Sequence, residues 1–106
     1  MDFERVRREK FLDNNARVLR AVNALRERYI KITDLEYGLG AEMNSAEISD
    51  CINYLNESGY IKLRSIEGHT EIADLADAEM NTIEAKLTAK GIAFLNGKIN
   101  DPCIRR

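Results

Sequence analysis

Tryptophan is absent from this chain of 106 residues, aromatic residues make up only 7%, and the single proline stands at position 102. No apolar run approaches the ~20 residues that a membrane-spanning helix needs. The first residues, MDFERVRR, lack the apolar core of a signal peptide. We therefore expect a cytoplasmic protein with one small hydrophobic core.

The chemical groups that carry out catalysis are equally scarce. His69 is the only histidine, and the two cysteines, Cys51 and Cys103, form neither a metal-ligand spacing nor a disulfide framework. The stretch Gly38-Leu39-Gly40 lacks the Lys and the Ser or Thr of a phosphate-binding loop. The acidic residues between positions 71 and 79 do not follow the spacing of a calcium loop. We therefore expect no enzymatic activity, no metal and no cofactor.

Charge is present in quantity but is unevenly distributed, although the net value is only −2. Residues 1–31 hold nine basic and five acidic side chains, for +4, whereas residues 32–84 hold two basic and twelve acidic ones, for −10. Residues 85–106 hold five basic and one acidic side chain, for +4. Such a chain is suited to bind a polyanion through its ends and not through its middle.

The first part of the chain predicts one long helix. Apolar residues recur at three- and four-residue steps over residues 2–28, and neither glycine nor proline interrupts them. Asn14-Asn15 is the weakest point, where the helix either continues or breaks, with Asn15 as the cap of a second helix. We therefore set residues 1–14 apart as a helical extension of a domain spanning residues 15–97. Residues 98–106 contain few packing residues and are expected to form a tail.

Two capping signatures predict the next two helices. Thr33 begins the first signature, TDLE, and is expected to cap a short helix that the glycines at 38 and 40 limit. Asn44 begins the second signature, NSAE, and is expected to cap a helix from Ser45 to about Ser58. Cys51 falls on the apolar face of this longer helix, where it is expected to be a small core residue.

Alternation of apolar and polar residues predicts three strands, over residues 30–32, 60–65 and 81–87. Gly59 stands where a left-handed residue ends the preceding helix. Residues 67–70 are expected to form a turn, and residues 71–80 are open between a long loop and a poor helix. Thr88 is expected to cap a last helix that ends at Gly97.

Over residues 15–97, this order of helices and strands resembles the winged helix-turn-helix family. Two motifs carry the resemblance: Leu55–Ile61 (LNESGYI), where a helix turns into a strand, and Leu87–Gly91 (LTAKG), where the last strand precedes the closing helix. The chain length and the basic tail add a likeness to the short winged-helix proteins carried by Mu-like bacteriophages. The resemblance implies an α+β, mainly helical fold: a winged helix-turn-helix with an extended N-terminal helix and a wing sheet of two or three strands.

The resemblance also implies a DNA-binding phage or bacterial transcriptional regulator, in which the helix that begins at Asn44 enters the major groove. The side chains expected to contact DNA are Asn44, Ser45, Ser49 and Asn53 on that helix and Arg17 and Arg20 on the first helix. The charge of that helix is unfavourable, because it carries Glu47, Asp50 and Glu57 and no Lys or Arg. The expected wing, residues 66–80, is also acidic, with only His69 as a potential cation. The alternative is a protein–protein adaptor that docks its acidic helix and wing on a basic partner without binding DNA.

Apolar residues near both ends predict a homodimer. The expected interface residues are Phe3, Val6 and Phe11 of the first helix and Phe94 and Leu95 of the last. Phe3, Val6 and Phe11, if exposed, would form a patch that requires a partner, either the same helix of a second copy or the last helix with Ile92, Phe94 and Leu95. Three roles stay open for the basic residues of the first helix: a solvated face that offsets the acidic middle, contact with nucleic acid, and contact with an acidic partner.

Overall fold

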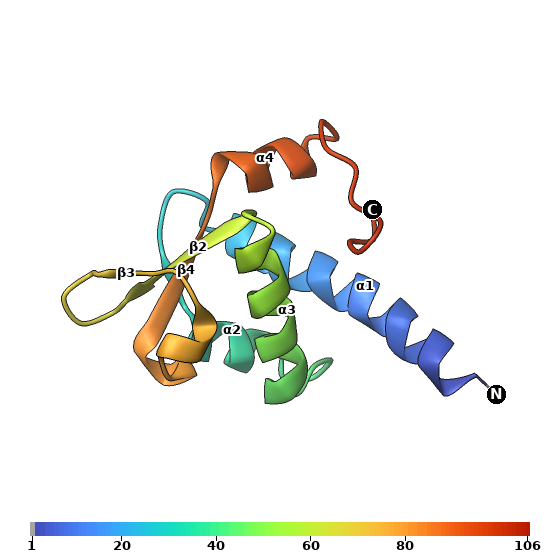
Figure 1. The fold of residues 1–106 in the computed structure, drawn as a ribbon, viewed down its shortest axis with the longest axis horizontal. Helices are drawn as coiled ribbons and strands as arrows, with labels where there is room; N and C mark the ends of the chain where they lie inside the picture. Colours follow the sequence, from blue (N-terminus) through green and yellow to red (C-terminus); the bar gives the residue numbers. More distant parts are fainter. Residues whose placement is uncertain (1) are drawn as a thin grey trace.

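Four α-helices and a four-stranded antiparallel sheet make up residues 2–106, the part of the chain described by this computed structural model (Figure 1). The helices are α1 (Phe3–Asn23), α2 (Ile32–Leu39), α3 (Ser45–Glu57) and α4 (Ala89–Leu95). The strands are β1 (Ile30–Lys31), β2 (Ile61–Ser65), β3 (Glu71–Ile72) and β4 (Ile83–Leu87). The predicted α+β class is confirmed.

The sheet has the order β1-β4-β2-β3, one strand more than expected. The additional strand, β3, lies within the stretch 71–80 and pairs Ile72 with Leu63 of β2. Two short 3-10 helices, η1 (Leu75–Asp77) and η2 (Met80–Thr82), then lead into β4. The stretch is therefore neither one long loop nor an α-helix.

A single hydrophobic core lies between the helices and one face of the sheet. Its fully buried members include Leu19 and Val22 of α1, Ile52 of α3, Leu63 of β2 and Ile83 of β4. Each of these elements is amphipathic and buries its apolar side only against the others. The Cα radius of gyration of 13.3 Å matches the ~13 Å expected for a folded chain of about 100 residues.

Helix α1 is continuous through Asn14 and Asn15, so the sequence alternative of a break at this point is wrong. Both side chains are buried and bond to partners outside their own backbone. Asn15 Nδ2 donates to the Cys103 carbonyl at 2.9 Å, and Asn14 Oδ1 accepts from the Arg17 guanidinium at 2.8 Å. Because these amides do not compete for the backbone hydrogen bonds of the helix, α1 continues past them. It ends at Asn23, five positions before the predicted end at residue 28.

One predicted cap is wrong and the other is confirmed. Helix α2 begins at Ile32, before Thr33, and its first turn has no side-chain cap. Ile32 is fully buried, so packing and not capping fixes this helix start. At α3, Asn44 Oδ1 accepts the Glu47 N–H at 2.8 Å and Glu47 Oε1 accepts the Asn44 N–H at 3.0 Å, which completes the predicted capping box.

The two sequence motifs contact each other directly. Gly59 has a φ of +85°, which turns the chain from α3 into β2. Thr88 Oγ1 donates to the Gly59 carbonyl at 2.5 Å and accepts the Gly91 N–H at 3.1 Å as the cap of α4. A side chain at Gly91 would overlap the Tyr60 carbonyl oxygen and lie 2.7 Å from Cδ1 of Leu87. The two motifs therefore form one joint between α3, the sheet and α4.

Residues 98–106 are not the tail that the sequence predicted; they fold back between α4 and α1 (Figure 1). Ile104 is 3% exposed and belongs to the core. The Arg105 N–H donates to the Leu12 carbonyl at 3.1 Å, and its guanidinium pairs with Glu9 and Asp13. The segment packs because one apolar side chain and several polar ones find partners far away in the sequence.

Candidate functional site

The outward side of α3 is where the resemblance places the functional surface. The side chains at Ile48, Ile52 and Leu55 point into the core. Ala46, Asp50, Asn53 and Glu57 lie along the opposite side, at the spacing of one helical ridge. We call these four residues the α3 ridge.

The predicted DNA-contacting residues of α3 are partly engaged within the chain. The Asn44 side-chain oxygen accepts the Glu47 N–H in the capping box. Ser45 Oγ donates to Glu36 of α2 at 2.7 Å. Ser49 and Asn53 are half-buried. Of this set, only Asn53 belongs to the α3 ridge.

The two predicted arginines of α1 do not join the α3 ridge. Arg17 donates to Asn14 and lies 3.8 Å from the Glu42 carboxylate, in the connection between α2 and α3. Arg20 instead lines a pocket of about 170 Å³ formed by α1, α4 and the C-terminal segment. The structure therefore does not gather the predicted DNA-contacting side chains on one surface: Asn53 lies on the α3 ridge, Ser45 bonds to α2, and Arg20 lies by the C-terminal segment.

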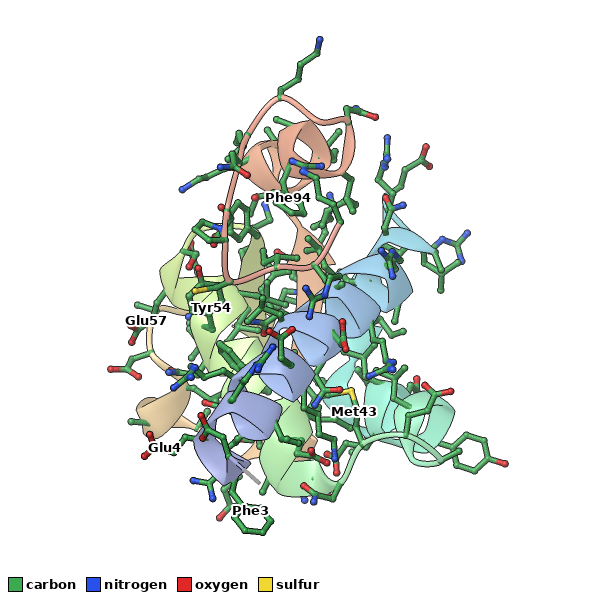
Figure 2. All side chains as sticks on the ribbon, turned by 90° about the vertical axis from the view of Figure 1, so that its right-hand side faces the viewer. Phe3, Glu4, Met43, Tyr54, Glu57 and Phe94 are labelled. Carbon is green, nitrogen blue, oxygen red and sulfur yellow. The ribbon has the colours of Figure 1, made fainter. Side chains whose placement is uncertain are left out.

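The first part of α1 passes beside α3 and projects beyond it. We call residues 3–10, which are all exposed, the arm. Lys10 Nζ lies 2.7 Å from the Glu47 carboxylate, and this bond, with the backbone bond from Asn44, lowers the pKa of Glu47. Phe11 packs edge-on against Tyr54 with ring centroids 5.6 Å apart. Figure 2 shows Phe3 at the far end of the arm, pointing away from the rest of the molecule.

A groove of about 410 Å³ separates the arm from the α3 ridge. Its lining consists of Glu4, Arg7, Arg8 and Phe11 of α1 and Asp50 of α3. Asp50 forms no ion pair with the two arginines, although all three side chains border the same groove. Cations of the arm are therefore close to the α3 ridge without neutralising it.

Exposed carboxylates continue from α3 to the hairpin and the 3-10 segment. Those of Asp50, Glu57, Glu67, Glu71, Asp74 and Glu79 form no ion pair within residues 2–106. Asn56 Nδ2 donates to the Ala73 carbonyl at 3.0 Å, which places the residue before Asp74 against the end of α3. We call Asp50, Glu57 and Asp74 the acidic face. These three carboxylates form no ion pair within residues 2–106, although Arg7 and Arg8 border the same groove as Asp50.

The predicted interface residues differ in their accessibility. Phe3 and Val6 are 71% and 54% exposed, whereas Phe11 is half-buried against Tyr54. Phe94 is only 3% exposed, and Leu95 is half-buried. The Phe94 ring is covered within the single chain, because it packs against Tyr60, with the Arg106 guanidinium 4.3 Å above it.

A polar cluster that the sequence did not predict lies beneath the C-terminal segment. The Asp101 carboxylate accepts hydrogen bonds from the Tyr54 and Tyr60 hydroxyls, the shortest being 2.7 Å and 2.8 Å, and from the Cys103 N–H at 2.9 Å. Partial burial alone would raise the pKa of Asp101, but these bonds outweigh it and lower that pKa. Burial, and secondly the bond to Asp101, raises the pKa of Tyr60 to about 12. Only the proline at 102 marked this region in the sequence.

Cys51 is buried in the core as predicted. Burial raises the pKa of its thiol to about 12, and the nearby Asp50 and Glu47 carboxylates add to the shift. Among the side chains that the structure describes, no group of three or more His, Cys, Asp or Glu is placed to hold a metal. No helix in residues 2–106 has the length and apolar character to cross a bilayer.

The preceding distances and burial define the fold and the acidic face of Asp50, Glu57 and Asp74. Comparison of the chain with protein-family models, with curated proteins and with solved structures gives no match.

Proposed function

We propose that this chain is a winged-helix module that binds a basic protein partner through the acidic face. The order of its elements supports the winged-helix assignment: β1 follows the first helix and pairs with β4, β2 and β4 follow α3, and α4 closes the fold. In this reading, α2 and α3 form the helix-turn-helix, with residues 40–44 as the turn. The strands after α3 and the segment 66–82 form the wing.

The observation that carries the proposal is that the carboxylates of the acidic face form no ion pairs within residues 2–106. Asp50, Glu57 and Asp74 are exposed and have no cation within 4.0 Å in residues 2–106. Neutralising phosphates supplies most of the non-specific affinity of proteins for DNA, and carboxylates oppose it. The same carboxylates favour a basic protein surface, because complementary potentials accelerate encounter and reject like-charged partners.

The test compares two labelled probes at low salt by fluorescence anisotropy: a lysine- and arginine-rich peptide and mixed-sequence duplex DNA. We expect the wild-type chain to bind the peptide at micromolar concentration. The variant with Asp50→Lys and Glu57→Lys should bind it about tenfold more weakly. The matched control reverses Glu27 and Asp34, two exposed acids that belong neither to α3 nor to the acidic face, and should bind like wild type. Equal weakening in both variants would refute the acidic face as a docking surface.

A second function, DNA binding, is favoured by one observation. Arg7 and Arg8 line the groove beside Asp50, so the arm places cations next to the α3 ridge. If DNA is bound, replacing Arg7 and Arg8 by Glu should weaken binding strongly. The salt dependence should then fall by about one ion for each phosphate that is no longer neutralised. Micromolar affinity of the wild type for the duplex, with this response to the two substitutions, would replace the adaptor by a DNA-binding protein.

A further inference from the structure

We infer that the basic partner of the acidic face is the arm of a second copy of this chain, in a reciprocal dimer. The inference rests on the proposed function, because it takes the acidic face to be a docking surface. It goes beyond that function by naming the partner and the segment that docks.

The arm has one side that combines apolar and cationic groups. Phe3, Val6, Arg7 and Lys10 follow the i, i+3, i+4, i+7 spacing of a single helix face. We call these four residues the arm stripe. The carboxylates of the arm have other partners: Glu4 lies 4.0 Å from Arg8, and Glu9 pairs with Arg105 of the C-terminal segment. The arm stripe therefore combines two exposed apolar side chains with two cations, of which Lys10 is paired with Glu47 inside the chain and Arg7 forms no ion pair within residues 2–106.

The arm stripe and the acidic face are complementary in charge, and a first contact of this kind already exists within one chain. Lys10 at the inner end of the stripe binds Glu47 of α3 at 2.7 Å. The outer end of the stripe runs past α3, so Phe3 remains 71% and Val6 54% exposed. The inner end is thus satisfied inside the chain, whereas the outer end and the acidic face both lack a partner among residues 2–106.

A second copy supplies both missing partners at once. The arm of one copy meets the acidic face of the other, and the same contact recurs in the opposite direction around a twofold axis. Such an isologous arrangement is closed, so it leaves neither an arm nor an acidic face exposed. A basic foreign protein on the acidic face would leave Phe3 and Val6 uncovered, and adjacent exposed apolar side chains favour an interface.

The first experiment exchanges the charges of the two surfaces and measures mass by sedimentation velocity. One variant carries Arg7→Glu, since Arg7 is the cation of the arm stripe that forms no ion pair within residues 2–106. The other variant carries Asp50→Lys and Glu57→Lys. We expect the wild type to be dimeric at tens of micromolar and each variant alone to be a monomer of about 12.1 kDa. An equimolar mixture should dimerise again, because both reciprocal contacts then join opposite charges.

The mixture also controls for folding. Restored association shows that both variants retain their surfaces, and circular dichroism of each variant measures its helix content. A mixture that remains monomeric while both variants keep wild-type helix content would overturn the inference. A wild type that is monomeric at roughly 100 µM in low salt would overturn it as well.

A second pair of variants tests the apolar part of the arm stripe. Replacing Phe3 and Val6 by Ala should weaken dimerisation about tenfold or more, because two exposed apolar side chains lose their burial in the interface. The matched control is Leu25→Ala, since Leu25 is 52% exposed but lies after the end of α1, away from the arm. Equal effects of the two changes would contradict the assignment of the interface to the arm.

Two results distinguish self-docking of the arm from docking of a foreign basic protein. If the wild type is monomeric but binds the basic peptide through Asp50 and Glu57, self-docking is refuted and the proposed function stands. If the wild type dimerises but the exchange of charge at Asp50 and Glu57 affects neither dimerisation nor peptide binding, both are refuted.

Discussion

Asp101 is the residue on which the attachment of the C-terminal segment depends most. Its carboxylate accepts from the hydroxyl groups of Tyr54 in α3 and Tyr60 before β2, and from the Cys103 N–H. Replacing Asp101 by Asn leaves two phenolic donors facing a neutral amide. We expect the free energy of unfolding to fall by about 1–3 kcal/mol. Urea denaturation measures this decrease, and the exposed change Glu27→Gln should leave the value unchanged.

The same residue predicts a pH dependence. The pKa of Asp101 is lowered by folding, so its contribution to stability is complete above the ordinary value of 3.8 and is lost as pH falls through the folded value. The difference in stability between wild type and Asp101→Asn should therefore shrink as pH is lowered below about 4. Urea midpoints at a series of pH values measure it. A difference that stays constant into strong acid would contradict the role of the charge.

Gly91 and Gly38 are glycines in helices with opposite expected responses to alanine. At Gly91 a Cβ would overlap the Tyr60 carbonyl oxygen and crowd Leu87 at 2.7 Å, so α4 would have to move away from the joint. We expect Gly91→Ala to destabilise the fold by about 1–3 kcal/mol, as overpacking does. At Gly38, inside α2, no atom lies within 4 Å of the new Cβ. Gly38→Ala should stabilise by about 0.5–1 kcal/mol, and thermal unfolding of the two variants compares them.

At the scale of elements, the two ends of the chain are expected to respond in opposite ways to truncation. Deleting residues 98–106 removes the buried Ile104, the Asp101 cluster and the partner of Asn15, so stability should fall by more than about 3 kcal/mol. Deleting residues 2–6 removes only side chains that are exposed in the single chain, so at protein concentrations below those of dimerisation stability should change by about 0.5 kcal/mol or less. Chemical denaturation of the two truncated chains measures both values. Equal decreases would mean that the arm contributes to the fold.

The elements that the sequence located well are those whose signals are local. Asn44 and Glu47 form their capping box, Gly59 adopts its positive φ, and Thr88 caps α4, because these bonds join residues within one turn. Thr33 has the same signature and does not cap a helix. The burial of Ile32 starts α2 two residues earlier than a Thr33 cap would, and Glu36 bonds Ser45 instead. Local chemistry was insufficient there because tertiary packing competed with it.

At the scale of the whole molecule, the three segments that the sequence predicted, residues 1–14, 15–97 and 98–106, contact one another. The arm is joined to the C-terminal segment by Glu9 and Arg105, and α1 is joined to that segment by Asn15 and Cys103. We therefore expect one cooperative unfolding transition. The midpoints from far-UV circular dichroism, which reports the helices, and from tyrosine fluorescence should coincide. A separate early transition in tyrosine fluorescence would show that the C-terminal segment detaches first.

The distribution of charge is also a property of the whole molecule. The sequence predicted an acidic middle and basic ends, and the structure leaves the acidic face and the arm cations Arg5 and Arg7 without ion pairs among the described residues. Residue counts could not predict that Lys10 binds Glu47 or that Arg20 lies by the C-terminal segment, away from α3. Those neighbours depend on how α1 packs against α3 at one end and against the C-terminal segment at the other.

The sequence by itself determined the α+β class, the positions of most helices and strands and the charge of each segment, because periodicity, caps and composition involve residues close together in the chain. The tertiary structure decided that α1 passes Asn14 unbroken, that Phe94 is covered and that the last nine residues fold back against α1 with Ile104 in the core. Each of these depends on a partner dozens of residues away, such as Cys103 for Asn15, and no local pattern encodes such a pairing.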